Sequence, residues 1–178
     1  MSNVIWVTGL SAAGKTTLAT SLRESLTLMG HSTILLDGDV LRECLDVKQQ
    51  TGREERKKLA FTYSRLANML SSQGVIVIVG TIALFREIHL WNRKNIEGYY
   101  EIFLNVPVEE LKRRDPKGIY KKFDQGQIKN VAGLDIDVDF PLEPHLQINF
   151  NKKNTPDMIS KLALSSFLEF KNKNEQKE

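Results

Sequence analysis

The stretch Gly9-Leu10-Ser11-Ala12-Ala13-Gly14-Lys15-Thr16 fits the pattern G-x-x-x-x-G-K-[ST] at every fixed position. It follows the short apolar run 4–7 and opens a region in which leucines recur at helical spacing, which is the strand–loop–helix context that the pattern requires. In that context the backbone N–H groups of the loop and of the helix N-terminus converge on phosphate oxygens. Lys15 supplies a positive charge to the β- and γ-phosphates, and the hydroxyl of Thr16 can bind Mg²⁺. The stretch therefore predicts a site for a nucleoside triphosphate with Mg²⁺.

Apolar runs alternate with amphipathic stretches along the rest of the chain. The expected strands are 4–7, 33–36, 75–79, 100–106 and 146–150. The run 75–79 is β-branched throughout, and an unbroken apolar strand is typical of a parallel sheet that is covered on both faces. Strands that alternate with helices predict an α/β fold, a three-layer sandwich with a central five-stranded parallel sheet. We expect a last helix to start near Thr155-Pro156, and the polar tail after Phe170 to fray.

Composition limits the class of protein. The chain has 178 residues, enough for one domain, which we expect over 1–170 with a polar tail at 171–178. Hydrophobic residues make up 41% and charged residues 26%, which argues against disorder, a collagen or a coiled coil. No apolar run approaches the ~20 residues of a membrane span, and no basic region of a signal peptide is seen. Cys44 is the only cysteine, and a formal charge of +3 is too slight to favour nucleic acid. We expect a cytoplasmic enzyme for a small molecule, with no membrane or nucleic-acid partner.

A pair of carboxylates, in Asp37-Gly38-Asp39, follows the second expected strand. Ligands of open α/β sheets bind beyond the carboxyl ends of the strands, so both carboxylates should lie near Lys15. There they can hold Mg²⁺ through water, and one of them can accept the proton of an acceptor hydroxyl. The alternative is an Asp-Gly turn with Asp39 as a helix N-cap. No Asn-Lys-x-Asp guanine-reading motif is present, and little chain is left for switch or motor elements, so the pattern favours a small ATP-dependent kinase.

The stretch 115–144 differs from the rest of the chain. It is rich in charges and glycine, and it has little hydrophobic period. A loop of this length inside a compact domain is usually functional, and basic residues gather at its start. We therefore interpret 115–144 as a lid; the alternative is a solvated surface excursion.

These residues resemble the adenylylsulfate (APS) kinase family, small phosphate-loop enzymes that phosphorylate the ribose 3′-hydroxyl of adenosine 5′-phosphosulfate. The resemblance covers roughly residues 4–146. Its markers are 8–11, 36–39 with Arg42, 74–78, 114–122, Lys129 and 133–135. The stretch 114–122 is the strongest marker, because it is very close to the family's lid signature.

The resemblance implies a role for each matching residue. ATP would be held by Gly9, Ser11, Ala12, Ala13, Gly14, Lys15, Thr16, Thr17 and Arg114. Of the adjacent Arg113 and Arg114, one would reach the nucleotide and the other would lie on the surface. Mg²⁺ would be held by Thr16 and Asp37, and the catalytic residues would be Lys15, Asp37 and Asp39, with either aspartate as the base. The acceptor nucleotide would contact Asp39, Arg42, Arg56, Ile82, Ala83, Lys117, Lys121, Lys129 and Val131. The resemblance also implies a homodimer.

Three departures from the family's pattern lie where the acceptor would bind. Val131 stands where the family usually has a lid phenylalanine that stacks on adenine, and such a stack contributes ~1–3 kcal/mol. Ala83 stands in place of a serine after the third strand, and Leu59 in place of a polar substrate contact. Three changes in one pocket, with the phosphate machinery intact, favour a changed acceptor over random drift.

The run 81–88, continued through 92–93 to 99–102, resembles a divergent branch that contains kinases of bacterial capsule modification, cytidine diphosphoramidate kinase among them. A pyrimidine needs less stacking area than adenine, which would fit Val131. We therefore prefer cytidine diphosphoramidate as the acceptor, with adenylylsulfate in sulfate assimilation as the alternative. Two rivals are a nucleotide-binding regulatory protein without catalysis, which the intact phosphate machinery disfavours, and a nucleoside or shikimate-type kinase, which the lid signature disfavours.

Overall fold

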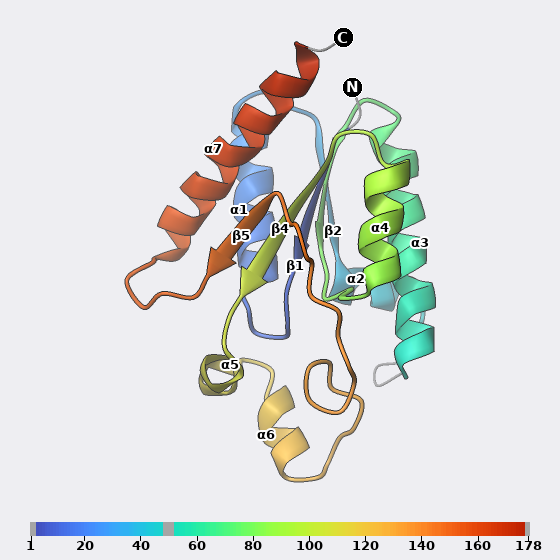
Figure 1. The fold of residues 1–178 in the computed structure, drawn as a ribbon, viewed down its shortest axis with the longest axis vertical. Helices are drawn as coiled ribbons and strands as arrows, with labels where there is room; N and C mark the ends of the chain where they lie inside the picture. The colour runs from blue at the N-terminus through green and yellow to red at the C-terminus, as the bar shows by residue number, and fades with distance from the viewer. Residues whose placement is uncertain (1–2, 48–51, 177–178) are drawn as a thin grey trace.

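The computed structural model describes residues 3–47 and 52–176, and a five-stranded sheet forms its centre (Figure 1). The strands are β1 (Asn3–Thr8), β2 (Thr33–Asp37), β3 (Ile76–Gly80), β4 (Tyr99–Asn105) and β5 (Leu146–Asn149). They lie in the order β2-β3-β1-β4-β5, and each neighbouring pair is parallel. The predicted five-stranded parallel sheet is confirmed, and each strand boundary lies within one residue of the predicted one.

Helices cover both faces of this sheet. They are α1 (Lys15–Leu28), α2 (Gly38–Cys44), α3 (Arg53–Ser71), α4 (Arg86–Asn95), α5 (Val108–Arg114), α6 (Ile119–Asp124) and α7 (Pro156–Glu175). Figure 1 shows α1 and α7 on one face and α3 and α4 on the other. The predicted three-layer sandwich is therefore confirmed. No helix among the described residues is long and apolar enough to cross a membrane.

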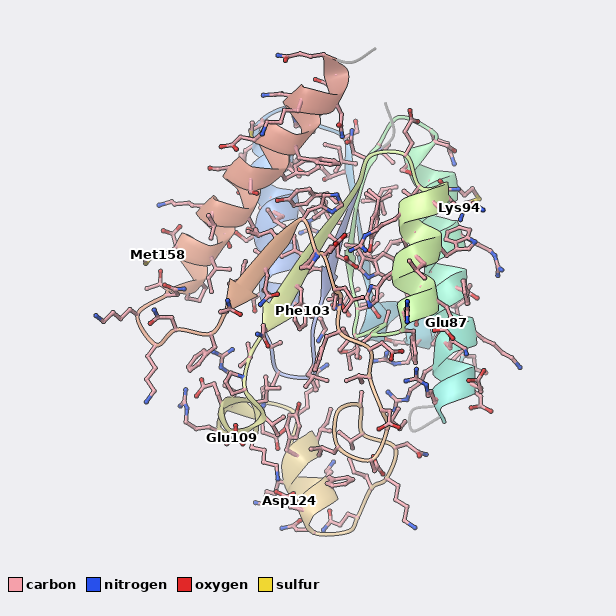
Figure 2. All side chains as sticks on the ribbon, in the orientation of Figure 1. Glu87, Lys94, Phe103, Glu109, Asp124 and Met158 are labelled. Carbon is pink, nitrogen blue, oxygen red and sulfur yellow. The ribbon has the colours of Figure 1, made fainter. Side chains whose placement is uncertain are left out.

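The core consists of two apolar clusters, one on each face of the sheet. Strand residues alternate between faces, so Ile5 packs with Leu22 and Phe167 under α1 and α7, while Trp6 packs with Tyr63 under α3. β1 and β3 are buried along their whole length, as the unbroken apolar runs predict. Figure 2 shows side chains filling both spaces between the layers, with the labelled Glu87, Lys94, Glu109 and Asp124 at the outside.

Two strand registers set the geometry of the functional end. Gly80, the last residue of β3, pairs with Val7 of β1 on one side and with Asp37 of β2 on the other. The three strands therefore end at the same level, and the loops that follow them meet there. Figure 1 shows α5 and α6 lying beyond this end of the sheet.

Two expectations need correction. α7 begins as predicted, with Thr155 Oγ1 accepting from Met158 N at 3.2 Å and Pro156 in the first turn. However, α7 runs on to Glu175, so the chain does not leave the helix after Phe170; an ion pair between Lys171 and Glu175 at 2.6 Å supports its last turn. The stretch 115–144 is not a continuous loop either, because it contains α6 and a bridge between Ala132 and Ile136.

Candidate active site

A cavity of about 1210 Å³ lies at the carboxyl end of the sheet. Its walls come from the loop 9–16, from the residues after β2 and β3, from α3, from the lid segment 115–144 and from the start of α7. A pocket for one drug-sized ligand measures roughly 300–1,000 Å³, so this cavity has room for two small substrates side by side.

The phosphate loop connects β1 to α1. Gly9 has φ +150°, and a Cβ there would lie 2.8 Å from the carbonyl oxygen of Leu104, so only glycine fits. Gly14 has φ +100° and is the N-cap of α1, which begins at Lys15. Residues 11–17 line the cavity, whereas Gly9 lies behind it and acts through the shape of the loop. The first turn of α1 thus turns its unpaired N–H groups toward the cavity, as an anion site requires.

Lys15 is held by its own loop. Its Nζ donates to the carbonyl oxygen of Leu10 at 2.7 Å. Burial, then the nearby charge of Lys117 and to a lesser extent that of Arg42, lowers the pKa of Lys15 to about 7, against an opposing effect of Asp37. The negative charge of a polyanion beside this amine would favour its charged form and raise its pKa, so ligand binding and protonation of Lys15 are coupled.

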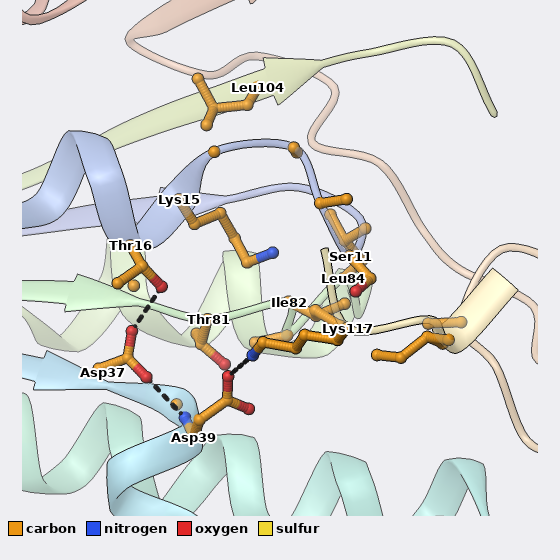
Figure 3. A pocket seen from close by; sticks show the side chains of 18 of the residues that line it. Ser11, Lys15, Thr16, Asp37, Asp39, Thr81, Ile82, Leu84, Leu104 and Lys117 are labelled. Atoms are coloured by element: carbon orange, nitrogen blue, oxygen red, sulfur yellow. Dashed lines mark hydrogen bonds and ion pairs between the residues drawn. The ribbon is translucent and has the colours of Figure 1, made fainter. Parts of the chain in front are cut away.

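Thr16 in the first turn of α1 and Asp37 at the end of β2 come together. Thr16 Oγ1 donates to Asp37 Oδ2 at 2.7 Å, and Asp39 N donates to Asp37 Oδ1 at 2.8 Å (Figure 3). Asp37 is also the N-cap of α2, so the turn-and-cap alternative holds for Asp37 rather than for Asp39. A hydroxyl and a carboxylate are the hard oxygen donors that Mg²⁺ prefers, and this ion usually takes only one or two protein ligands beside substrate phosphates. No cluster of three or more acidic, histidine or cysteine ligands occurs among the described residues.

Asp39 turns its carboxylate into the cavity from the first turn of α2. It forms ion pairs with Arg42 of the same helix and with Lys117 of the lid segment (Figure 3). Both partners carry a positive charge toward the cavity, and Arg56 adds a third from α3. Burial, followed by the charge of Arg42, lowers the pKa of Arg56, which marks this side as electropositive.

The lid segment is docked on the rest of the site. Tyr120 Oη donates to the carbonyl oxygen of Ser11 at 3.1 Å, and Arg56 Nη2 donates to that of Asn130 at 2.7 Å. A Cβ on Gly133, which has φ +81°, would lie 2.8 Å from Leu10 Cδ2, so the segment touches the phosphate loop there. The end of the lid segment that leads to β5 is held by Arg53, which pairs with Asp139 at 2.6 Å.

The far wall of the cavity contains Arg114. Arg114 lines the cavity, stacks over the ring of Phe150 at 5.2 Å and pairs with Glu110 at 2.8 Å, whereas 72% of the Arg113 side chain is exposed. The expectation that one arginine faces the site and the other the surface agrees with this geometry. Hydrogen bonds from Arg113 and Arg114 lower the pKa of Glu110 to about 2, so the carboxylate that pairs with Arg114 stays ionised.

The structure brings together all but two of the residues singled out from the sequence. The cavity lining includes Ser11, Ala12, Ala13, Gly14, Lys15, Thr16, Thr17, Asp37, Asp39, Arg42, Arg56, Ile82, Ala83, Arg114, Lys117, Lys129 and Val131. Gly9 and Lys121 are not part of it, and Lys121 is exposed on α6.

Three parts of the lining were missed. Thr81 directly follows β3, and its place at a strand end could have identified it. Tyr63 has the helical spacing of a core residue, yet its hydroxyl donates to the carbonyl oxygen of Gly38 at 3.4 Å beside the carboxylates. The lining residues of 154–160, before and in the first turns of α7, carry no motif that signals a ligand.

We predict that ATP binding takes up a proton at pH 8. The free amine of Lys15, with a pKa of about 7, is mostly neutral at that pH, and bound phosphates raise its pKa so that it becomes charged. Apparent ATP affinity should therefore fall as pH rises above 7. Calorimetry without acceptor, in buffers of different ionisation enthalpy, measures the uptake. The Lys15→Arg control stays protonated throughout; equal uptake by wild type and control at pH 8 contradicts the coupling.

Comparisons with known proteins agree with this geometry. The family model described as adenylylsulphate kinase matches residues 1–149. The chain is 42% identical over 166 residues to cytidine diphosphoramidate kinase of Campylobacter jejuni, covering 90% of this chain and 96% of that one. It is 39% identical over 154 residues to a probable adenylyl-sulfate kinase of Archaeoglobus fulgidus, covering 86% and 99%. The structure of the Mycobacterium tuberculosis APS kinase CysC in complex with AMPPNP and APS superposes with a TM-score of 0.86 at 29% identity, over 94% of this chain and 98% of that one. The chain therefore belongs to the adenylylsulfate kinase family, whose members are ATP-binding kinases that phosphorylate an alcohol group of a nucleotide.

Proposed function

We propose that the protein transfers the γ-phosphoryl group of ATP to the ribose 3′-hydroxyl of cytidine diphosphoramidate, with Mg²⁺ as cofactor. Phosphoryl transfer to an alcohol group follows from membership of the family. The identity of the acceptor is what we propose for this chain in particular. The runner-up acceptor is adenylylsulfate.

The observation that carries the acceptor is the shortage of free aromatic surface in the cavity. Among the described lining residues only Tyr63 and Phe85 are aromatic. The Tyr63 hydroxyl donates to the carbonyl oxygen of Gly38. The guanidinium of Arg53 lies 5.1 Å from the centre of the Phe85 ring and covers one face of that ring. The lid segment contributes Val131, which is only 6% exposed and packs with the core. A pyrimidine depends less than adenine on the ~1–3 kcal/mol of a base–aromatic stack.

The similarity to known proteins supports the same acceptor without deciding it. The relative from Campylobacter jejuni that is 42% identical bears the name cytidine diphosphoramidate kinase. The second candidate, adenylylsulfate, is favoured by the relatives that are 35–39% identical and bear the name adenylyl-sulfate kinase, such as that of Pseudomonas aeruginosa at 38%.

The donor nucleotide would lie on the phosphate loop. Backbone N–H groups at the start of α1 and the ammonium of Lys15 would bind the phosphates, and Arg114 would flank the base. Thr16 and Asp37 would hold Mg²⁺, which when bound neutralises charge on the transferred phosphoryl group.

The acceptor would lie opposite, between the carboxylates and the lid segment. We assign Asp39 rather than Asp37 as the base, because Asp37 is tied to Thr16 and caps α2. The carboxylate of Asp39 instead faces the cavity, where phosphate groups of a bound substrate could take over its partners Arg42 and Lys117. Asp39 would accept the proton of the 3′-hydroxyl as its oxygen bonds to phosphorus and the bond to ADP breaks. Arg42, Arg56, Lys117 and Lys129 would bind the phosphate groups of the acceptor. Lys121, exposed on α6, is left without a role in this arrangement.

The first test compares acceptors. We predict a higher kcat/KM with cytidine diphosphoramidate than with adenylylsulfate for the wild-type protein. Val131→Phe should raise kcat/KM for adenylylsulfate by about tenfold to a hundredfold, because a ring at this position can stack on adenine. Val131→Leu is the matched control, since it adds bulk without a ring. Steady-state ADP release measures all three proteins.

A wild-type protein that prefers adenylylsulfate would overturn the proposed acceptor and leave the kinase chemistry in place. Equal gains from Val131→Phe and Val131→Leu would show that the aromatic ring is not the determinant.

The second test concerns the base. Asp39→Asn keeps the shape of the side chain but cannot take up the proton, so kcat should fall by about 10²–10⁴-fold. ATP affinity should change little, because the contacts that hold Thr16 and Asp37 remain. The control is Glu43→Gln on the exposed face of the same helix, which should leave kcat unchanged. If kcat for Asp39→Asn stays within a few-fold of wild type, Asp39 is not the base.

A further inference from the structure

Thr81 holds a hydroxyl group at the centre of the cavity. It follows β3 directly, it is 5% exposed, and it lines the cavity. Its backbone N–H donates to the carbonyl oxygen of Val7 at 3.1 Å, and the next carbonyl oxygen, that of Ile82, accepts from Thr8 Oγ1. Two hydrogen bonds to β1 therefore fix the backbone on which this hydroxyl stands.

The Thr81 hydroxyl lies beside the catalytic carboxylates. A Cβ built on Gly38, between Asp37 and Asp39, would come within 3.1 Å of Thr81 Oγ1. Figure 3 shows the hydroxyl directed toward the same space as the carboxylate of Asp39. A group that binds Asp39 from the cavity therefore has Thr81 as its next polar neighbour.

No hydrogen bond joins the Thr81 hydroxyl to any of residues 3–47 and 52–176. The neighbouring Asp39 carboxylate is instead paired with Arg42 and Lys117. The hydroxyl stands on a cavity wall, and an unpaired polar group there is expected to find its partner in a ligand or in water. Because Thr81 stands on the cavity wall, we expect the bound acceptor to be the hydrogen-bond partner of its hydroxyl.

Resting on the proposed 3′-hydroxyl chemistry, we propose that Thr81 binds the 2′-hydroxyl of the acceptor ribose. The 2′- and 3′-hydroxyls stand on adjacent ring carbons, so an acceptor whose 3′-hydroxyl contacts Asp39 carries its 2′-hydroxyl to the neighbouring position. A threonine hydroxyl can donate to that oxygen and accept from it. Thr81 thereby makes the site selective for ribonucleotides over 2′-deoxyribonucleotides.

The test compares wild type and Thr81→Val with two acceptors each, and Thr81→Ser is the control. The acceptor that the wild-type protein phosphorylates best in the comparison above is assayed beside its 2′-deoxy form. Wild type should prefer the ribose form in kcat/KM by about tenfold, the worth of one hydrogen bond. Thr81→Val, which replaces the hydroxyl by a methyl group of similar size, should reduce this preference to less than about twofold. Thr81→Ser keeps the hydroxyl and should keep the preference.

A stability measurement separates this contact from a structural role. Because the hydroxyl has no partner within the described protein, Thr81→Val should melt at the same temperature as wild type or higher. A Thr81→Val protein that still prefers the ribose form as wild type does, or that loses activity equally with both acceptors, overturns the inference and leaves the proposed function standing. A wild-type protein that phosphorylates no nucleotide acceptor overturns both.

Discussion

The hydrogen bond from Thr16 Oγ1 to Asp37 Oδ2, at 2.7 Å, joins the two halves of the site. Thr16 stands on the first turn of α1 after β1, and Asp37 ends β2, yet β3 lies between these two strands. The bond can form because Gly80 ends β3 at the level of Val7 in β1 and of Asp37 in β2, so that the residues after both strands meet across the end of β3. The phosphate loop and the two carboxylates to which we assign Mg²⁺ binding and proton transfer therefore depend on the register of three parallel strands.

The positive charge of the cavity lining favours the binding of two ligands that both carry phosphate groups. Lys15, Arg42, Arg56 and Lys117 converge on one cavity, and the pKa of Lys15 falls to about 7 through burial and then through Lys117 and Arg42. Asp39 is the carboxylate that pairs with Arg42 and Lys117. Phosphate groups of donor and acceptor would relieve the repulsion among these cations, and the small net charge of +3 is thus concentrated where it acts.

The sequence predicted what periodicity and strict spacing encode. The β-branched run at 75–79 predicted a buried parallel strand, and the loop pattern predicted where Lys15 and Thr16 meet the carboxylates. Features set by tertiary contact were missed. The helix N-cap is Asp37 rather than Asp39, because α2 begins at Gly38, two residues earlier than a cap at Asp39 would require. Lys121 has the lysine pattern of the lid but points to solvent, since α6 buries Tyr120 instead. The polar sequence after Phe170 stays helical through its own ion pair.

The central claim is that a parallel-sheet kinase site built around Asp39 accepts a cytidine nucleotide beside Val131. A crystal structure of the protein with ADP, Mg²⁺ and cytidine diphosphoramidate tests it most directly. The account predicts the ribose 3′-hydroxyl within hydrogen-bond distance of Asp39 and the pyrimidine ring against Val131. An acceptor bound with its 3′-hydroxyl away from Asp39, or with its base outside the wall that Val131 forms, would contradict it.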